Sequence, residues 1–464
     1  MEQPLVTVYI TNYNYEKYIK QAISSVLEQT LQSFELFIID DGSTDGSKAV
    51  IESFSAHQKV TIIYQKNKGL NITNNIALRL STGKYIMRLD ADDYLKSNAL
   101  EKMVADLEAD EELGMVFPDY FLIDAENNIT AEIKRHNFNE EVTLLDQPAH
   151  GACTMIRVDF LKAVGGYDES YSCQDGYELW IKFSSRFKVS NVREALFFYR
   201  QHGENLTSNE NRILDTRRSI NDNFILNNEI QLPTTIGIIP VRNQRLGKTT
   251  LPFVELNGKY LIDLKIEEAL TSKALSAVIV TSNVTQIKKY ILEKYGDNES
   301  VIFVERPEEL ARYNVSLVGT IQHILAQDIV AKIQPEAIML LPIEFPFVDK
   351  KIINDAVNAL VIFKADSLIS TREERATFYQ HHGGGMIPIM EQGNFTQLER
   401  EALYRGVGGI TLAKIDAFKE SEKLLNGKVG HISIDQKTAM GIFSAFDLNL
   451  VQLLLEKEVR MKAE

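Results

Sequence analysis

The sequence predicts an α/β protein with two domains in series, and three observations support this prediction. Short runs rich in β-branched residues alternate with amphipathic stretches in both halves of the chain, as in a largely parallel sheet covered by helices. A polar, charged segment separates the two halves. The length of 464 residues is too great for one ordinary hydrophobic core.

The first half, residues 1–208, contains the elements of one such domain. Apolar residues recur at helical spacing in two segments, so we expect helices at Tyr18 to Glu28 and Leu70 to Leu80. The expected strands are Val6 to Ile10, Phe34 to Ile39, Val60 to Tyr64, Tyr85 to Leu89 and Met115 to Pro118.

A helix and a linker, residues 209–233, are expected to join the halves, because apolar residues keep helical spacing to about Asn228 before Pro233 interrupts the pattern. Residues 234–464 resume the alternation and predict a second α/β domain. Its expected strands are Ile236 to Pro240, Ala277 to Thr281, Val301 to Glu305, Ala337 to Pro342 and Ser367 to Thr371. Its expected helices are Leu261 to Leu270, Val284 to Lys294, Ser316 to Ile329 and Lys351 to Phe363.

Composition narrows the classes of function. The formal net charge of -14 argues against a nucleic-acid partner, because such proteins neutralise phosphates with clustered Lys and Arg. Cys153 and Cys173 are too few for a disulfide framework and are typical of a reducing compartment. We see no signal peptide and no apolar run of the ~20 residues that a membrane span needs. We therefore expect a cytoplasmic protein, and leave open a peripheral association with the inner face of the membrane and a homo-oligomer.

Three acidic clusters are the main functional signal. Ligands of open α/β sheets gather beyond the carboxyl ends of the strands, where such clusters are expected to lie. The clusters are Asp40-Asp41-Gly42-Ser43-Thr44-Asp45, Asp90-Ala91-Asp92-Asp93 and Gln174-Asp175-Gly176-Tyr177-Glu178-Leu179-Trp180.

The second cluster predicts a divalent metal site for a nucleoside diphosphate. Carboxylate oxygens suit Mg²⁺ or Mn²⁺, which use few protein ligands and take the rest from phosphate and water. Asp90 and Asp92 flank one residue at a strand end, so both can face one site. We predict Asp92 as the metal ligand, with Asp90 nearer the ribose or a metal-bound water. The cation would neutralise a departing diphosphate.

The third cluster supplies a candidate general base. An acceptor hydroxyl that attacks a sugar must lose its proton, and a carboxylate opposite the leaving group can take it. Asp175 is the candidate. An Asp-Gly pair before an apolar run is equally typical of a turn or a helix N-cap, so this alternative stays open.

Together these motifs resemble the family-2 nucleotide-sugar glycosyltransferases with the GT-A fold. The run from Val6 to Asn14, Asp40 to Asp45, Asp90 to Asp93 and Gln174-Asp175 have the order and approximate spacing of that family over roughly residues 4 to 208. The resemblance implies a Rossmann-like nucleotide-binding domain. It also implies an inverting transfer from a nucleoside-diphosphate sugar, expected to be a UDP-sugar, to a hydroxyl of a surface glycan or glycoprotein.

The resemblance also implies roles for individual residues. Asp92 and Asp90 resemble the family residues on the metal side of the site, and Asp175 resembles the catalytic general base. Thr11 and Asp41 resemble the residues that hold the nucleobase of the donor. His202 resembles a late family residue that reaches the diphosphate or metal, although it could also be a surface-loop histidine. The donor-binding residues expected are Thr11, Asn12, Tyr13, Asp40, Asp41, Lys68, Asp90, Ala91 and His202.

Some positions depart from the family pattern. Asn74 stands where many relatives have an Arg, which leaves Lys68 and Arg88 as candidate phosphate partners. The QxxRW motif of processive polysaccharide synthases is absent, so non-processive transfer is expected. The segments His150 to Arg157 and Val164 to Asp168 resemble the acceptor-side loop and the helix after it.

The second half carries a basic loop after its first expected strand. Arg242, Arg245 and Lys248 could surround a phosphate group, and a basic surface turn is the alternative. This loop resembles acylneuraminate and deoxyoctulosonate cytidylyltransferases over about residues 234 to 460. The other segments that carry this resemblance are Leu251 to Phe253, Gly258 to Ile262, Arg306 to Ala311 and Tyr404 to Gly409. The resemblance implies a second, nucleotidyltransferase-like α/β fold.

The second half departs from that family in the residues that bind metal. Gly441-Ile442-Phe443 stands where an Asp-x-Asp would be usual, and only the later Asp447 is kept. We therefore predict a degenerate, non-catalytic domain that binds a partner, an acceptor or a nucleotide. Two alternatives stay open: a bifunctional enzyme that also makes a CMP-sugar, and a non-catalytic assembly protein built from two sugar-nucleotide folds.

Overall fold

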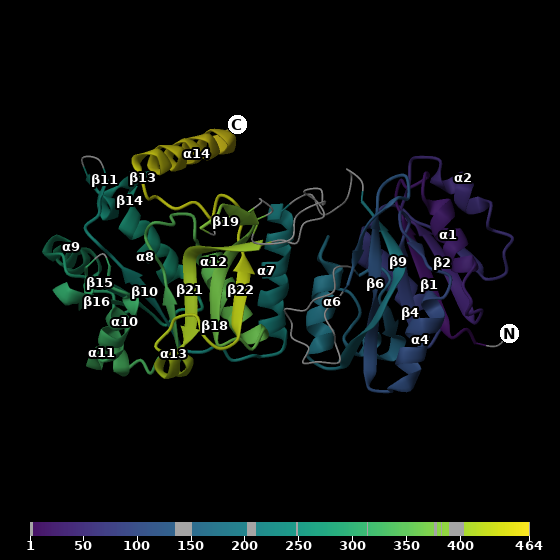
Figure 1. The fold of residues 1–464 in the computed structure, drawn as a ribbon, viewed down its shortest axis with the longest axis horizontal. Helices are drawn as coiled ribbons and strands as arrows, with labels where there is room; N and C mark the ends of the chain where they lie inside the picture. Colours follow the sequence, from purple (N-terminus) through teal and green to yellow (C-terminus); the bar gives the residue numbers. More distant parts are fainter. Residues whose placement is uncertain are drawn as a thin grey trace. The chain divides into compact units, whose positions relative to one another are not determined.

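The computed structural model describes residues 3–134, 151–201, 210–246, 249–312, 314–374, 378–381, 383–388 and 403–463. The chain divides into two compact units, Met1–Arg217 (unit 1) and Arg218–Glu464 (unit 2) (Figure 1). Each unit is α/β. The division falls inside the helix α7 (Glu210–Asn227).

Unit 1 is built on one mixed sheet with the strand order β3-β2-β1-β4-β8-β6-β9-β5, and β7 pairs with β6. The strands β3, β2, β1 and β4 are parallel, whereas β8 is antiparallel to both of its neighbours. The bounds are β1 (Val6–Asn12), β2 (Phe34–Asp40), β3 (Val60–Tyr64), β4 (Tyr85–Asp90), β5 (Tyr94–Leu95), β6 (Leu113–Ile123), β7 (Ile129–Ile133), β8 (Met155–Arg157) and β9 (Lys188–Arg200).

Helices cover both faces of this sheet because its central strands are apolar on both sides. Val8 and Ile10 of β1 pack with α1 and α4, while Tyr9, which points the opposite way, packs with α3 and α6. The helices are α1 (Ile19–Leu27), α2 (Ser47–Glu52), α3 (Leu70–Leu80), α4 (Ala99–Ala109), α5 (Val158–Ala163) and α6 (Asp175–Ser184).

Unit 2 has a second mixed sheet with the order β16-β15-β10-β17-β21-β18-β22. Its strands are β10 (Thr235–Pro240), β15 (Ala277–Ser282), β16 (Val301–Glu305), β17 (Ala337–Leu340), β18 (Ser367–Glu374), β21 (Leu403–Lys414) and β22 (Val429–Ser433). Short two-stranded pairs are β11 (Arg245–Leu246) with β12 (Thr249–Thr250), β13 (Glu255–Leu256) with β14 (Lys259–Tyr260), and β19 (Tyr379–His381) with β20 (Met386–Pro388).

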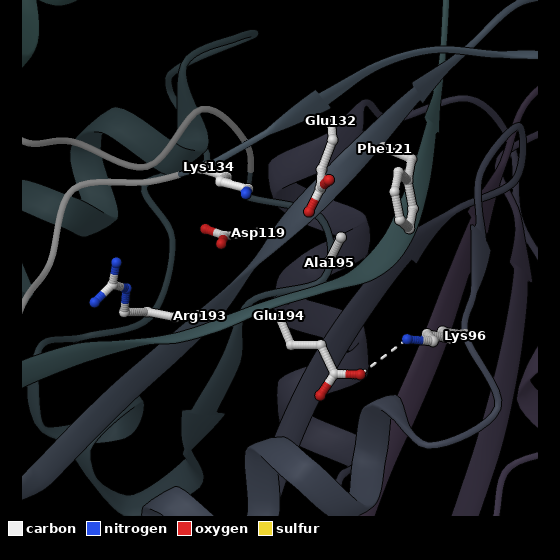
Figure 2. A pocket seen from close by; sticks show the side chains of 8 residues that line it. All are labelled: Lys96, Asp119, Phe121, Glu132, Lys134, Arg193, Glu194 and Ala195. Carbon is white, nitrogen blue, oxygen red and sulfur yellow. Dashed lines mark hydrogen bonds and ion pairs between the residues drawn. The ribbon is translucent and has the colours of Figure 1, made fainter.

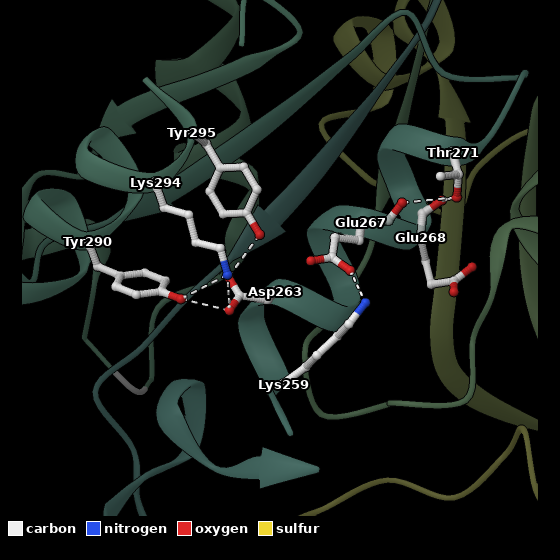
Figure 3. Close-up of polar contacts among 8 residues, drawn as sticks. All are labelled: Lys259, Asp263, Glu267, Glu268, Thr271, Tyr290, Lys294 and Tyr295. Carbon is white, nitrogen blue, oxygen red and sulfur yellow. Dashed lines mark hydrogen bonds and ion pairs between the residues drawn. The ribbon is translucent and has the colours of Figure 1, made fainter. Parts of the chain in front are cut away.

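The helices of unit 2 are joined by polar contacts as well as by apolar packing. The buried carboxylate of Asp263 on α8 accepts hydrogen bonds from the hydroxyls of Tyr290 (2.6 Å) and Tyr295 (2.8 Å) and from Nζ of Lys294 (2.7 Å) on α9 (Figure 3). The helices are α8 (Leu261–Thr271), α9 (Thr285–Tyr295), α10 (Leu317–Leu325), α11 (Asp328–Ala331), α12 (Lys350–Ile362), α13 (Ile415–Ser421) and α14 (Ala445–Ala463), with 3₁₀ turns η3 (Leu251–Phe253) and η4 (Glu308–Leu310).

The expected strands and helices are confirmed with shifts of their ends, with one exception. The largest shift is at β6, which runs on to Ile123 where the sequence predicted an end at Pro118. The single helix expected from Ser316 to Ile329 is wrong. The structure has α10 and α11 there, because Gln327 adopts an extended conformation that ends one helix and begins the other. In the described part of the chain, no helix combines the length and apolar character needed to cross a bilayer.

Candidate functional site

The carboxyl ends of β1, β2 and β4 bring several predicted residues to one edge of the unit 1 sheet. Strand register places Thr11 beside Asp90 and Asn12 beside Asp40. Oγ1 of Thr11 donates to Oδ1 of Asp90 at 3.2 Å, and Nδ2 of Asn12 donates to Oδ2 of Asp40 at 2.8 Å. Four residues predicted from separate motifs therefore form one polar edge.

Asp40 and Asp41 use their carboxylates to build the loops at this edge. Oδ1 of Asp40 accepts backbone N–H groups of Gly42 and Ser43, at 3.2 and 2.9 Å. Asp41 accepts the backbone N–H groups of Lys68 and Gly69, at 2.8 and 2.9 Å. Asp41 thus holds the loop that carries the exposed Lys68.

Arg88 connects the predicted metal side of the site with the predicted base. Its Nε lies 2.9 Å from Oδ1 of Asp90, and its Nη1 forms an ion pair with Oδ2 of Asp175. The Arg88 side chain is only 6% exposed. Because Asp90 ends β4 and Asp175 begins α6, one buried guanidinium joins two elements that are far apart in the sequence.

Asp175 does not cap its own helix. Gln174, in the left-handed conformation with φ 64°, occupies the N-cap position, and no side chain makes a capping hydrogen bond there. The N-cap alternative to a functional Asp175 is therefore wrong. The carboxylate faces Arg88 instead.

Arg200, at the end of β9, organises the turn that follows Asp90. Its Nε donates to the carbonyl oxygen of Asp92 at 2.8 Å, and its backbone N–H donates to Oδ1 of Asp93 at 2.9 Å. Asp92 and Asp93 are both buried, and so is Ala91. The other acceptors of the Arg200 guanidinium include the carbonyl oxygen of Asp124 and the side chains of Gln21 and Asn127.

The acidic cluster is electrostatically strained. Burial raises the pKa of Asp90, Arg88 lowers it, and the charges of Asp92 and Asp175 raise it again, so that the net shift is upward. Burial, then the charges of Asp92 and Asp90, raise the pKa of Asp93 well above its usual range. For Arg88 burial alone would lower the pKa, but Asp175 and Asp90 raise it above the ordinary value. Neighbouring carboxylates that repel one another in this way favour a bound cation.

The residues fit a divalent cation that takes part of its shell from a ligand. Within the described residues, no group of three or more His, Cys, Asp or Glu is arranged to hold a metal ion by itself. Mg²⁺ and Mn²⁺ need only one or two carboxylates when phosphate and water supply the other ligands. The cluster has Asp90, Asp92 and a buried Oδ2 of Asp93 that has no hydrogen-bond partner among the described residues.

Comparisons with known proteins identify the family of unit 1. Residues 7–165 match the family model described as Glycosyl transferase family 2. An uncharacterized glycosyltransferase of Haemophilus influenzae is 32% identical over 225 residues, which are 44% of this chain and 68% of that protein. The chain belongs to glycosyl transferase family 2.

Other similar proteins overlap this family-2 glycosyltransferase only in part. Chondroitin synthase of Escherichia coli is 32% identical over 207 residues, which are 44% of this chain but only 30% of that protein. The chain therefore spans less than a third of that relative's length. The crystal structure of S. aureus TarS 1-349 in complex with UDP-GlcNAc is 20% identical with a TM-score of 0.41, and the match covers 47% of this chain and 66% of that chain.

The family match contains the strand ends described above but ends before Asp175. His202 and Lys248 lie outside the described residues, as do parts of the segments expected on the acceptor side. Tyr13 is 46% exposed at the edge of the site. The roles predicted for all these residues stay predictions.

The α3 helix fixes the segment that follows α5. Nδ2 of Asn71 donates to the carbonyl oxygen of Asp168 at 2.7 Å, and Asn75 exchanges hydrogen bonds with the backbone of Tyr167 at 2.8 and 3.0 Å. Asn74 accepts a hydrogen bond from the hydroxyl of Tyr9 at 3.1 Å. Asn74 thus serves packing on α3 in this family-2 glycosyltransferase.

Sequence reasoning missed the roles of Arg88 and Arg200. Arg88 was expected to be a candidate phosphate partner, yet its guanidinium is engaged by two carboxylates. A signal was available, since Arg88 interrupts an apolar strand two residues before Asp90 and must point to the same side of the sheet. Arg200 likewise ends an apolar strand, but nothing local indicates that it reaches Asp92.

A hollow of about 400 Å³ lies elsewhere on unit 1, along β6, β7 and β9 (Figure 2). Charged groups of both signs line it, and none of the predicted site residues does. Its lining residues are Lys96, Asp119, Phe121, Glu132, Lys134, Arg193, Glu194 and Ala195.

Unit 2 has its own charged cluster at the carboxyl ends of parallel strands. Arg306, buried beyond β16, donates from Nη2 to the carbonyl oxygens of Val241 and Thr281, both at 2.9 Å. In the part of the chain that the structure describes, its Nε and Nη1 have no hydrogen-bond partner. Burial and then the charge of Arg242 lower the pKa of Arg306 to about 10. Arg242 and Glu344 follow β10 and β17, which flank the point where strand order reverses.

Proposed function

We propose that this family-2 glycosyltransferase moves a sugar from a nucleoside diphosphate, with a UDP-sugar as the expected donor, to an acceptor hydroxyl with inversion. One observation carries this proposal: Arg88 contacts Asp90 and Asp175 at the same time. The residue predicted on the metal side and the residue predicted as the base therefore share one site. Had either carboxylate faced a different surface, the mechanism would have no support.

The residues of the site have complementary tasks in this proposal. Asp175 takes the proton of the acceptor hydroxyl as that oxygen attacks the sugar. Thr11, Asn12 and Tyr13, with the loops built by Asp40 and Asp41, form the side of the site that holds the nucleotide. Asp92 and Asp90 would hold Mn²⁺ or Mg²⁺, which when bound neutralises the diphosphate.

Replacing the base tests the reaction. We predict that Asp175→Asn lowers kcat by about 10²- to 10⁴-fold, because an amide cannot accept the proton, while donor affinity changes little. Transfer is measured with a panel of nucleotide sugars and Mn²⁺, and donor binding by calorimetry. Asp159→Asn is the matched control, since Asp159 is an exposed carboxylate in the first turn of another unit 1 helix. Full activity in Asp175→Asn would remove Asp175 from the mechanism.

Removing the metal tests the other side of the site. We predict that EDTA abolishes transfer and that added Mn²⁺ restores it. Asp92→Ala should weaken donor binding in the presence of Mn²⁺ much more than in its absence, because the carboxylate acts through the cation. Undiminished transfer in EDTA would contradict the metal role.

The acceptor is proposed as a hydroxyl of a surface glycan or glycoprotein, with one sugar added per encounter. Product length resolved by mass spectrometry distinguishes single from processive addition. Cytoplasmic location, membrane association and oligomeric state stay predictions.

For unit 2 we propose a degenerate nucleotidyltransferase-like domain that binds an anionic group without catalysing transfer. Two nitrogens of Arg306 that have no hydrogen-bond partner among the described residues, beside the charge of Arg242, favour anion binding. The retained Asp447 accepts hydrogen bonds from N–H of Phe443 (3.0 Å) and Oγ of Ser444 (2.9 Å), so it caps the start of α14. This use of the carboxylate argues against a metal-binding role.

A direct assay separates this candidate from a CMP-sugar synthetase. The full chain is incubated with CTP, Mg²⁺ and nonulosonic acids, and pyrophosphate release is measured. Release would establish a second activity. Binding of CTP or pyrophosphate without release, lost in Arg306→Met, would support the degenerate domain.

A further inference from the structure

We propose that Arg88 is a positioning residue that acts through Asp175: it holds one carboxylate oxygen of the base so that the other faces the acceptor hydroxyl. This inference rests on the proposed function of unit 1. In this inference Arg88 affects the reaction without contacting the sugar.

The local structure places the guanidinium between two carboxylates. Arg88 and Asp90 are two residues apart on β4, so their side chains leave the same face of the sheet. Nη1 of Arg88 donates a hydrogen bond to Oδ2 of Asp175, and Nε lies 2.9 Å from Oδ1 of Asp90 in an ion pair whose N–H direction does not meet hydrogen-bond geometry. A planar guanidinium with fixed donor directions can set the separation and the angle of two carboxylates. It also offsets the repulsion between them.

The two oxygens of Asp175 are in different situations. Oδ2 is engaged by Arg88, whereas Oδ1 has no hydrogen-bond partner within the described part of the chain. Gly151 lies against the engaged side, because a Cβ there would come within 2.7 Å of Oδ2 and 3.1 Å of Nη2 of Arg88. Arg88 and Gly151 therefore restrict rotation of the carboxylate, and Oδ1 is the oxygen left to accept a proton.

A purely structural ion pair on the same helix offers a comparison. Glu178 is buried on α6 and pairs with Lys182. The charged ends of that pair also contact the backbone of Gly166 and Asp168, but within the described residues they contact none of Asp90, Asp92 and Asp175, so loss of the pair should lower stability without changing kcat. Arg88 differs because its partners are the base and the metal-side aspartate.

The test compares conservative variants in the full chain. Arg88→Lys keeps the charge but has one nitrogen, which cannot hold both carboxylates in one geometry. We expect kcat to fall by about 10²-fold, as for a misplaced catalytic group, while KM for the donor changes by less than about threefold. Lys182→Met is the control and should keep the kcat of the wild type while lowering the thermal midpoint.

A double-mutant cycle distinguishes positioning from a separate role. If Arg88 acts through Asp175, Arg88→Lys in the Asp175→Asn background should cause no further loss of kcat. Multiplied losses, or a rise of KM for the donor with unchanged kcat, would overturn the inference and make Arg88 a donor-binding residue. If the wild type transfers no sugar from any donor, the proposed function is wrong. If the wild type is active and Arg88→Lys is fully active too, only this inference is wrong.

Discussion

Arg200 shows how one buried cation can support a site that it does not enter. Arg200 is 1% exposed, and its guanidinium donates to carbonyl and side-chain oxygens from three different segments, among them the carbonyl of Asp92. A buried charge of this kind is tolerated only when its donors are paired. The shape of the Asp92-Asp93 turn therefore depends on Arg200.

We predict that Arg200→Met lowers the free energy of unfolding of unit 1 by about 3–5 kcal/mol, because buried oxygens lose their donor. Urea denaturation followed by the fluorescence of Trp180 measures it. Arg193→Met on the same strand is the control, and since Arg193 is exposed it should stay within about 0.5 kcal/mol of the wild type. Equal effects of the two substitutions would refute the role of Arg200.

Lys265 is the corresponding buried cation of unit 2. Its Nζ donates to the carbonyl oxygens of Phe345 (2.8 Å) and Val348 (3.0 Å), which belong to the loop after β17. Burial lowers the pKa of Lys265 to about 7 from the ordinary 10.5, although nearby acidic residues oppose the shift. The folded chain thus loses this proton well before the unfolded chain does.

The stability of unit 2 should therefore rise with pH. Between about pH 7 and 10 the unfolded state binds more protons at Lys265, so the free energy of unfolding increases by up to about 1.4 kcal/mol per pH unit, with no contribution below pH 7. Lys265→Met should remove this slope. Urea titrations at pH 6, 7, 8 and 9 followed by circular dichroism check it, and equal slopes in both proteins would contradict it.

At the scale of elements, the segment before β8 and the start of α6 meet at the site. Gly151 allows the backbone to approach Asp175 more closely than any residue with a Cβ could. No side-chain hydrogen bond caps the start of α6 among the described residues, so a cap does not fix the position of Asp175. The geometry of the base thus depends on two elements and on β4.

We predict that Gly151→Ala lowers kcat at least about 10-fold, because the added methyl displaces Oδ2 of Asp175. The thermal midpoint should change much less than kcat. Gly319→Ala in α10 is the control, since the nearest atom there is the flexible end of Leu310 and helical alanine is favourable. An unchanged kcat in Gly151→Ala would show that the base tolerates the displacement.

At the scale of the whole molecule, the two units have separate cores, so each should unfold in its own transition when denaturant is added. The chain has one tryptophan, Trp180, and it is fully buried in the core of unit 1. Its fluorescence therefore reports on unit 1, whereas circular dichroism reports on both units.

We predict that Mn²⁺ with a bound donor stabilises unit 1 by about 2.7 kcal/mol at a donor concentration of 100 times Kd. The fluorescence transition and the unit 1 part of the circular dichroism transition should both move to higher denaturant, and the unit 2 part should not move. Lys265→Met should change only the transition seen by circular dichroism. A single transition that both changes shift together would show that the units unfold as one.

The sequence by itself predicted ten strands, most of the longer helices and the polar residues at the strand ends, because periodicity and turn chemistry act over a few residues. It did not predict β8, β9, β21, β22, α4 or α6, nor the order of the strands in either sheet. The prediction of a single helix from Ser316 to Ile329 was wrong, because the backbone of Gln327 is extended there. Only the tertiary structure shows that Arg88 joins Asp90 to Asp175, although Arg88 and Asp175 are 87 residues apart in the sequence. Only the tertiary structure shows that Asp41 holds the loop that carries Lys68. Such pairs form only when strand order and helix packing bring distant segments together, and no local pattern encodes that proximity.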